Sequence, residues 1–117
     1  MFSLEKKTIL ITGASGGIGL HAAKLFLRFG AKVIITARRK KELKKKVNKI
    51  NNKNLSYYVM DVTKKEDISI TIEKIFKNFK QIDILVNNAG ITVSKEIFEH
   101  NYSDWSKVID TNLTGAW

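Results

Sequence analysis

Four of the eight residues at positions 12–19 are glycines, in the order Thr-Gly-Ala-Ser-Gly-Gly-Ile-Gly. Where such a turn joins a strand to a helix, unpaired backbone N–H groups and the helix dipole can hold a phosphate. We expect Gly13 to allow a sharp turn, Gly17 to leave room for a diphosphate beside the backbone, and Gly19 to let the helix pack closely on the strand. A Gly-rich segment can also be only a flexible loop, but its place between an apolar run and a helical pattern favours phosphate binding. The candidate phosphate-binding residues are Gly13, Ser15, Gly17, Ile18 and Gly19.

Two arginines follow the second apolar run, in the segment Thr-Ala-Arg-Arg at positions 36–39. In dinucleotide-binding folds an acidic residue at this place accepts hydrogen bonds from the ribose hydroxyls of NAD, whereas an Arg clamps the 2′-phosphate of NADP. No Asp or Glu occupies the position here. We therefore predict NADP as the cofactor, with NAD as the alternative, and expect Arg38 to be the main phosphate partner and Arg39 its helper. The other interpretation is that these two residues only open a basic helix.

Short apolar runs alternate with helical patterns along the chain. Continuous apolar strands between amphipathic helices are typical of a parallel sheet that is covered on both faces. The fold class predicted is therefore α/β, a doubly wound parallel sheet with its ligand site at the carboxyl ends of the strands. Strands are expected at residues 8–11, 33–35, 57–60 and 82–86, and helices at residues 18–29, 40–50, 68–79 and, with Ser103 as a plausible N-cap, 103–113.

Four motifs together resemble the short-chain dehydrogenase/reductase family. They are Thr-Gly-x-x-x-Gly-x-Gly at positions 12–19, Asp-Val at 61–62, Asn-Asn-Ala-Gly at 87–90, and Asp-Thr-Asn-Leu-Thr-Gly at 110–115. The resemblance runs from residue 4 to residue 117 and is greatest to 3-oxoacyl-carrier-protein reductases and to sugar or polyol dehydrogenases. It implies the N-terminal portion of a Rossmann-type fold, with about four strands and their flanking helices in one NAD(P)-binding domain over residues 1–117.

The resemblance also implies roles for individual residues. Asp61 would hydrogen-bond the adenine amino group with Val62 packed against the ring, and Asn87 would line the ribose side of the cofactor. Asn112 would be the Asn of the catalytic tetrad, whose backbone carbonyl holds a relay water in a kinked helix. The plainer interpretations are a turn-forming Asp, a sheet-supporting Asn and an ordinary helical Asn. The cofactor-binding residues implied in this part of the chain are Asp61, Val62, Asn87, Ala89 and Gly90.

The family's chemistry needs a Tyr with a Lys four residues later and a Ser upstream, while the nicotinamide carries the hydride. None of the three tyrosines, Tyr57, Tyr58 and Tyr102, has a Lys four residues later. The expected function is an NADP-dependent oxidoreductase that transfers hydride between nicotinamide and a carbonyl or secondary alcohol. We expect this chain to be its cofactor-binding part, cut before the catalytic Tyr-x-x-x-Lys segment. The alternative is a catalytically inactive nucleotide-binding fragment from a truncated or split gene.

Composition limits the remaining functions. The chain has no Cys, which excludes disulfides and thiolate metal sites, and no metal site is predicted. No apolar run is long enough to span a bilayer and no signal peptide is visible, so a cytoplasmic protein without a membrane partner is expected. A net charge of +10 would favour binding to a polyanion, or it reflects an AT-rich genome. The basic cluster at 38–49 lacks the interleaved aromatic residues of a nucleic-acid site. The expected partners are a nicotinamide dinucleotide, a small carbonyl or alcohol substrate and, for the full-length form, further copies of itself.

Overall fold

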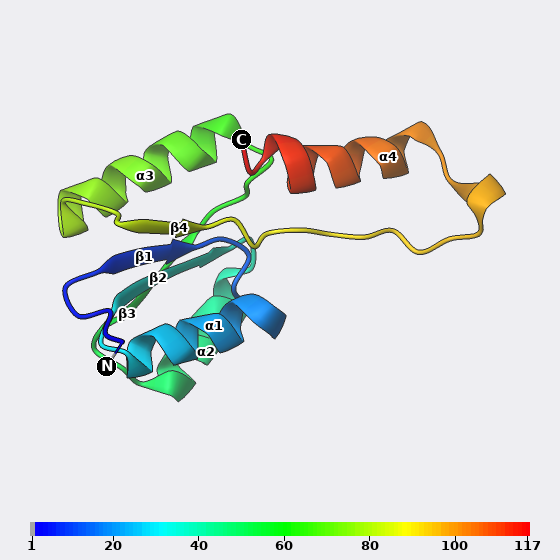
Figure 1. Ribbon diagram of the computed structural model, residues 1–117. Helices are drawn as coiled ribbons and strands as arrows, with labels where there is room; N and C mark the ends of the chain where they lie inside the picture. The colour runs from blue at the N-terminus through cyan, green and yellow to red at the C-terminus, as the bar shows by residue number, and fades with distance from the viewer. Residues whose placement is uncertain (1) are drawn as a thin grey trace.

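In the computed structural model, which describes residues 2–117, a four-stranded parallel sheet forms the centre of the molecule (Figure 1). The strand order is β3-β2-β1-β4, so the chain moves outward from β1 to β3 and then crosses back to place β4 on the other side of β1. This reversal puts a topological switch point at the carboxyl ends of β1 and β4, where open α/β sheets bind their ligands. The strands are β1 (Thr8–Ile11), β2 (Lys32–Ala37), β3 (Leu55–Val59) and β4 (Ile84–Val86).

Helices cover both faces of the sheet, as the continuous apolar strands predicted. Ile9 and Ile11 of β1 point into the core beneath two of the helices, whereas Leu10 and Ile34 point to the opposite face. Residues that alternate along one strand are thus buried in two separate cores, which confirms the doubly wound α/β arrangement. The first face carries α1 (Gly17–Arg28) and α2 (Lys40–Ile50), and the second carries α3 (Lys65–Phe79) (Figure 1).

The boundaries of three strands differ from those predicted. The second strand covers residues 32–37 rather than 33–35. The third strand begins at Leu55 rather than at residue 57 and ends at Val59, so Met60 lies beyond it, although the Met60 N–H still donates to the Ala37 carbonyl at 3.0 Å. The fourth strand pairs with β1 only from Ile84, and just before it the Asp83 carboxylate accepts the Thr8 N–H at 2.7 Å. Of these differences, those at the ends of β2 and β3 lie at the carboxyl edge of the sheet, where the ligand site was expected.

The last helix, α4 (Tyr102–Ile109), begins one residue after Asn101, and the expectation that Ser103 caps it was wrong. The Asn101 side chain accepts the Asp104 N–H at 2.9 Å, and the Asp104 carboxylate accepts the Asn101 N–H at 3.2 Å. This reciprocal pair satisfies two N–H groups at the helix start, which Ser103, already the second residue of the helix, cannot do. The helix then continues into a π-helical turn at Asp110–Thr114.

The segment from β4 to α4 projects away from the sheet as an arm, which we define as residues 91–117 (Figure 1). The radius of gyration of the chain is 15.3 Å, above the roughly 13 Å that a compact domain of this length would have. Asp104 is the only buried residue of α4. Large apolar side chains of the arm are exposed, namely Ile97, Phe98, Tyr102, Trp105, Leu113 and Trp117. Within residues 2–117, no helix combines the length and the apolar character that a membrane crossing requires.

We expect the 117-residue chain to self-associate, because apolar side chains are exposed along the arm and β4 leaves one edge of the sheet unpaired. Sedimentation velocity over a range of concentrations should show a shift towards larger species. Phe98→Gln combined with Trp105→Gln should weaken the association, whereas Ile70→Gln, which removes a half-exposed apolar side chain from α3, should not. A sharp, reversible melt of a monomer at every concentration would contradict this expectation.

Candidate functional site

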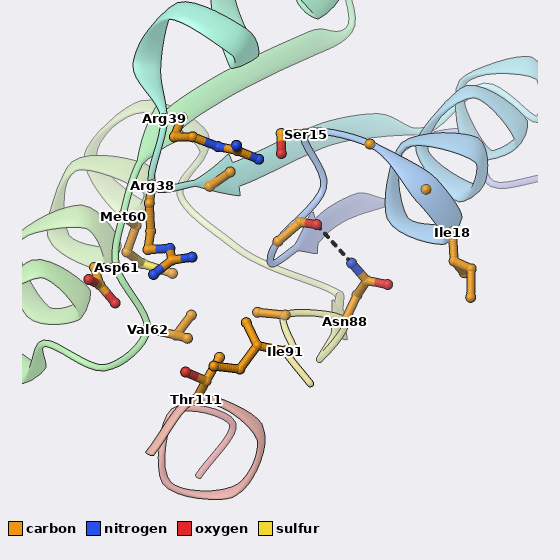
Figure 2. A pocket seen from close by; sticks show the side chains of 16 residues that line it. Ser15, Ile18, Arg38, Arg39, Met60, Asp61, Val62, Asn88, Ile91 and Thr111 are labelled. Carbon is orange, nitrogen blue, oxygen red and sulfur yellow. Dashed lines mark hydrogen bonds between the residues drawn. The ribbon is translucent and has the colours of Figure 1, made fainter. Parts of the chain in front are cut away.

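A cleft of about 540 Å³ opens at the carboxyl ends of the strands (Figure 2). Five parts of the chain line it: the Gly-rich turn, the segments that follow β2, β3 and β4, and Thr111 of the π-helical turn. The cleft therefore lies at the switch point between β1 and β4, as predicted from the order of the elements.

The Gly-rich turn is held against the segment that follows β4. Gly13 has a φ of +63°, and a Cβ built there would lie 2.6 Å from the Cα of Ala89. A Cβ at Gly19 would likewise collide with the side-chain amide of Asn88. Gly13 thus combines a left-handed backbone with a backbone contact that only glycine permits, and Gly19 allows the first turn of α1 to approach the end of β4.

The first turn of α1 presents N–H groups to the cleft. Its N-cap, Gly16, has an extended backbone and no side chain to bond the helix start, and the earliest helical N–H with a partner is that of Leu20. The N–H groups of residues 17–19 are therefore free to bind a ligand. No heavy atom lies within 4 Å of the Cβ position at Gly17, so space remains beside this backbone. Free N–H groups at the positive end of a helix form an anion site.

Asn88 joins the Gly-rich turn to the end of β4. Its side-chain amide donates to the carbonyls of Thr12 at 2.9 Å and Gly13 at 3.1 Å, and Figure 2 shows the bond to Gly13. In return, the Thr12 hydroxyl accepts the N–H groups of Asn88 at 3.2 Å and Ala89 at 3.1 Å. Four hydrogen bonds thus fix the Gly-rich turn relative to the neighbouring segment. Sequence reasoning named Asn87 as the ligand-facing residue, but Asn87 is exposed and is not among the residues that line the cleft.

Arg38 and Arg39 both reach the cleft from the end of β2. Arg38 extends towards Asp61 and Val62, and Arg39 extends along the rim towards Ser15 (Figure 2). Arg39 forms an ion pair with Glu42 in the first turn of α2, with 3.0 Å between the guanidinium nitrogen and the carboxylate oxygen. Arg38 makes no ion pair with the described residues. The cleft is therefore cationic at its β2 side.

Asp61 stays ionised beside these arginines. Its partial burial acts to raise its pKa, but the hydroxyl and N–H of Thr63, which donate at 2.7 and 2.9 Å, act to lower it. The charges of Arg38 and Lys64 lower it further, and together these contacts hold the pKa of Asp61 below its ordinary value. Oδ1 is occupied by Thr63. A ligand amino group would therefore meet a carboxylate that accepts hydrogen bonds.

Asn112 joins the π-helical turn to Ile91, the first residue of the arm. Its side-chain oxygen accepts the Ile91 N–H at 2.7 Å and its amide donates to the Ile91 carbonyl at 2.9 Å. The residue lies in the π-helical turn, a local distortion of the kind that recurs at functional sites, at the place where the resemblance implied a kinked helix. Asn112 itself does not line the cleft, but Ile91 and Thr111 do.

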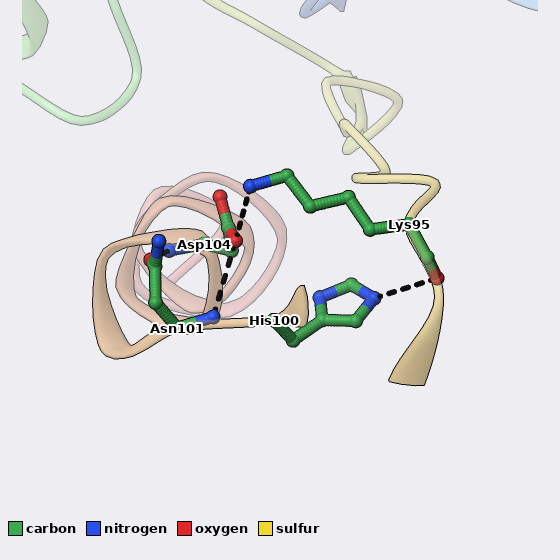
Figure 3. A network of polar contacts seen from close by, with 4 residues as sticks. All are labelled: Lys95, His100, Asn101 and Asp104. Carbon is green, nitrogen blue, oxygen red and sulfur yellow. Dashed lines mark hydrogen bonds and ion pairs between the residues drawn. The ribbon is translucent and has the colours of Figure 1, made fainter. Parts of the chain in front are cut away.

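A second polar network joins Lys95, in the loop between β4 and α4, to the start of α4 (Figure 3). Lys95 Nζ lies 2.7 Å from Oδ2 of Asp104, and the His100 ring contacts the Lys95 carbonyl at 3.2 Å. The Lys95 hydrogen bond is the main reason that the pKa of Asp104 lies below its ordinary value. Burial opposes the shift, while the Asn101 N–H and the charges of Lys95 and His100 support it. The network fixes how the loop joins α4.

Most of the predicted site residues meet in the cleft. Those that line it are Gly13, Ser15, Gly17, Ile18, Arg38, Arg39, Asp61, Val62, Ala89 and Gly90. Gly19, Asn87 and Asn112 do not line it, although Gly19 and Asn112 support residues that do. The lining residues that sequence reasoning missed are Gly16, Ala37, Met60, Asn88, Ile91 and Thr111. Asn88 could have been found from the Asn-Asn pair, since one of two adjacent amides at a strand end faces inward. Thr111 reaches the cleft only because of the π-helical turn.

No group of three or more metal-ligating side chains occurs within residues 2–117.

Comparison with known proteins identifies the family. The family model described as short chain dehydrogenase matches residues 7–117. The chain belongs to the short-chain dehydrogenase family. The family consists of oxidoreductases and binds nicotinamide cofactors. The fold class and the resemblance inferred from the sequence are thus confirmed.

Three relatives illustrate the similarity. An uncharacterized oxidoreductase of Staphylococcus saprophyticus is 35% identical over 116 residues, which are 99% of this chain and 47% of the relative. A short-chain dehydrogenase structure from Novosphingobium aromaticivorans has a TM-score of 0.91 at 25% identity, covering 98% of this chain and 43% of the other. The 3-ketoacyl-(acyl-carrier-protein) reductase of Brucella melitensis, solved with NADH, has a TM-score of 0.89 at 33% identity, covering 97% and 46%. The chain spans about half the length of these relatives.

Removing the Thr12 hydroxyl should loosen the turn. In Thr12→Val the side chain keeps its shape, but the N–H groups of Asn88 and Ala89 lose their acceptor. We expect the free energy of unfolding, measured by urea denaturation, to fall by about 1–3 kcal/mol, the cost of an unsatisfied buried donor.

The matched control is Thr36→Val, because the buried Thr36 hydroxyl is the one buried side-chain polar atom of the described chain without a partner. This substitution should raise the free energy of unfolding by about 1 kcal/mol. Equal effects of the two Thr→Val changes would show that the hydrogen bonds of Thr12 do not support the site.

The stability contributed by Asp104 should depend on pH. Because the pKa of Asp104 is lower in the folded chain than in the unfolded chain, its stabilisation is complete above the ordinary Asp pKa and is lost as the pH falls through the lowered value. Asp104→Asn should remove this part of the acid dependence of unfolding, and Asp110→Asn, at an exposed acid of the π-helical turn, should retain it. Identical acid profiles for wild type and Asp104→Asn would contradict the expected contribution.

Proposed function

We propose that this chain binds NADP and serves as the cofactor-binding part of an NADP-dependent oxidoreductase. The observation that carries the proposal is the pair Arg38 and Arg39 at the β2 side of the cleft, with no acidic residue in the segment between Thr36 and Arg39. A guanidinium favours a 2′-phosphate through charge-assisted, often bidentate, hydrogen bonds. Arg38 has no competing ion pair within the described chain, so it is the first candidate for this contact.

The remaining residues of the cleft fit the other parts of a dinucleotide. Gly17 and Ile18 would hold the diphosphate on their free N–H groups, and the φ of +55° at Gly17 favours a residue without a side chain at this place. Asp61 would accept a hydrogen bond from the adenine amino group, next to the apolar Val62 and Ile91. A dinucleotide that makes these contacts would lie with its adenosine end at the side of the cleft formed by the ends of β2 and β3. The nicotinamide, when bound, supplies the hydride acceptor or donor for a carbonyl or secondary alcohol.

The residues of this chain position the cofactor and do not themselves supply a general acid. None of the described tyrosines lines the cleft. Asn112 is the one residue of the described chain that the resemblance assigns to the catalytic tetrad, and its side chain makes one accepted and one donated hydrogen bond with Ile91. Its proposed contribution is to hold the π-helical turn beside the cleft. A catalytically inactive nucleotide-binding protein is the second candidate function, favoured by the absence of a described Tyr from the cleft.

Arg38→Met should reduce the affinity for NADPH by about ten- to a hundredfold, because a hydrogen bond to a charged group contributes about 1.5–3 kcal/mol. The affinity for NADH should hardly change, since its ribose carries a neutral hydroxyl. Isothermal titration calorimetry with both dinucleotides measures this difference. Arg28→Met, which removes the same charge from the exposed end of α1, is the matched control.

Equal binding of NADPH and NADH by the wild-type chain would overturn the NADP assignment and favour NAD or a cofactor-neutral site. NADPH oxidation with a small ketone tests the second candidate function. Turnover by the 117-residue chain would contradict the inactive nucleotide-binding protein, whereas binding without turnover is expected of a cofactor-binding part as well.

A further inference from the structure

Glu42 is the acidic residue that contacts the cationic side of the cleft. It lies in the first turn of α2, and its carboxylate is 3.0 Å from the Arg39 guanidinium. Arg39 is the N-cap residue of the same helix and lines the cleft, where its side chain extends along the rim towards Ser15 (Figure 2). The same guanidinium therefore belongs to an ion pair and to the proposed 2′-phosphate site.

The two arginines differ in whether another charged group already binds the guanidinium that a phosphate would contact. Arg38 forms no ion pair with the described residues and extends towards Asp61, which lies farther from it than ion-pair distance. Arg39 already donates to a carboxylate, so a phosphate must share its N–H groups or displace Glu42. The displaced carboxylate would remain close to the added negative charge, and like charges disfavour binding.

We propose that Glu42 limits the selectivity of the cleft for 2′-phosphorylated dinucleotides by holding Arg39 in an ion pair. This inference rests on the proposed NADP function and deepens it, because it assigns the selectivity to a balance between Arg38, Arg39 and Glu42. Glu42 is a positioning residue that acts through Arg39. Its removal should favour NADPH, whose 2′-phosphate gains a second free guanidinium, and should leave NADH unaffected.

A purely structural role of Glu42 predicts a different result. An acidic side chain in the first turn of a helix interacts favourably with the helix dipole, and Glu42 is the one acid in this turn of α2. On that basis its neutralisation would lower the melting temperature and leave the ratio of the two affinities unchanged. The ratio of NADPH to NADH affinity therefore separates the two roles.

The test compares NADPH and NADH binding to wild type, Glu42→Gln and Glu73→Gln by calorimetry. Glu73 is an exposed acid on α3, on the opposite face of the sheet, so its neutralisation changes the net charge equally. Glu42→Gln should raise the NADPH affinity about two- to fivefold, the range expected for an exposed ion pair. It should leave NADH binding unchanged, and Glu73→Gln should alter neither. Thermal melting of each variant confirms that it is folded.

A double variant tests whether the effect passes through Arg39. In the Arg39→Met background, Glu42→Gln should raise the NADPH affinity less than it does in wild type, because no guanidinium remains to be released. This inference is overturned, and the NADP proposal stands, if Glu42→Gln leaves the NADPH affinity unchanged or lowers it while Arg38→Met still weakens NADPH binding and not NADH binding. If Arg38→Met also fails to discriminate between the dinucleotides, the 2′-phosphate site is absent and both proposals fall.

Discussion

The contact between the Gly-rich turn and the end of β4 is the constraint on which the rest of the cleft depends. Two backbone segments that are distant in the sequence approach so closely at Gly13 and Ala89 that no Cβ fits between them. Thr12 and Asn88 close this contact with four hydrogen bonds. Because β1 and β4 are neighbours only through the reversal of strand order, the contact couples the topology of the sheet to the geometry of the anion site.

The cleft contains both positive groups and an ionised carboxylate, as the proposed dinucleotide site requires. The N–H groups of residues 17–19 and the two arginines give the site its positive potential. Asp61 keeps its negative charge because Thr63 and Arg38 stabilise it, which lets opposite ends of one ligand meet opposite charges. Glu42 offsets part of the positive charge at Arg39. The site therefore depends on a balance of charges and not on a general excess of lysine over the surface.

The sheet, the helices on its two faces and the position of the Gly-rich turn could be predicted because each depends on local patterns. The apolar period of residues 8–11 and the glycine spacing at 13–19 carry that information directly. The inward amide Asn88 was missed because only the pleat and the strand end decide which of two adjacent Asn side chains turns inward. The start of α4 was misplaced because Asn101 and Asp104 cap it reciprocally, and a Ser nearby fits the same pattern. Thr111 reaches the cleft through a helical distortion that no local pattern predicts.

The two hydrogen bonds between Asn112 and Ile91 close residues 91–112 into a loop joined to the sheet at its base. Lys95 and Asp104 close a smaller loop within it. Since the bonds at the base are exposed to water while the strands lie in two dry cores, the loop can open as a unit while the sheet stays folded. We therefore expect its amide hydrogens to exchange with solvent through local opening, and those of β1 to exchange by unfolding of the whole chain.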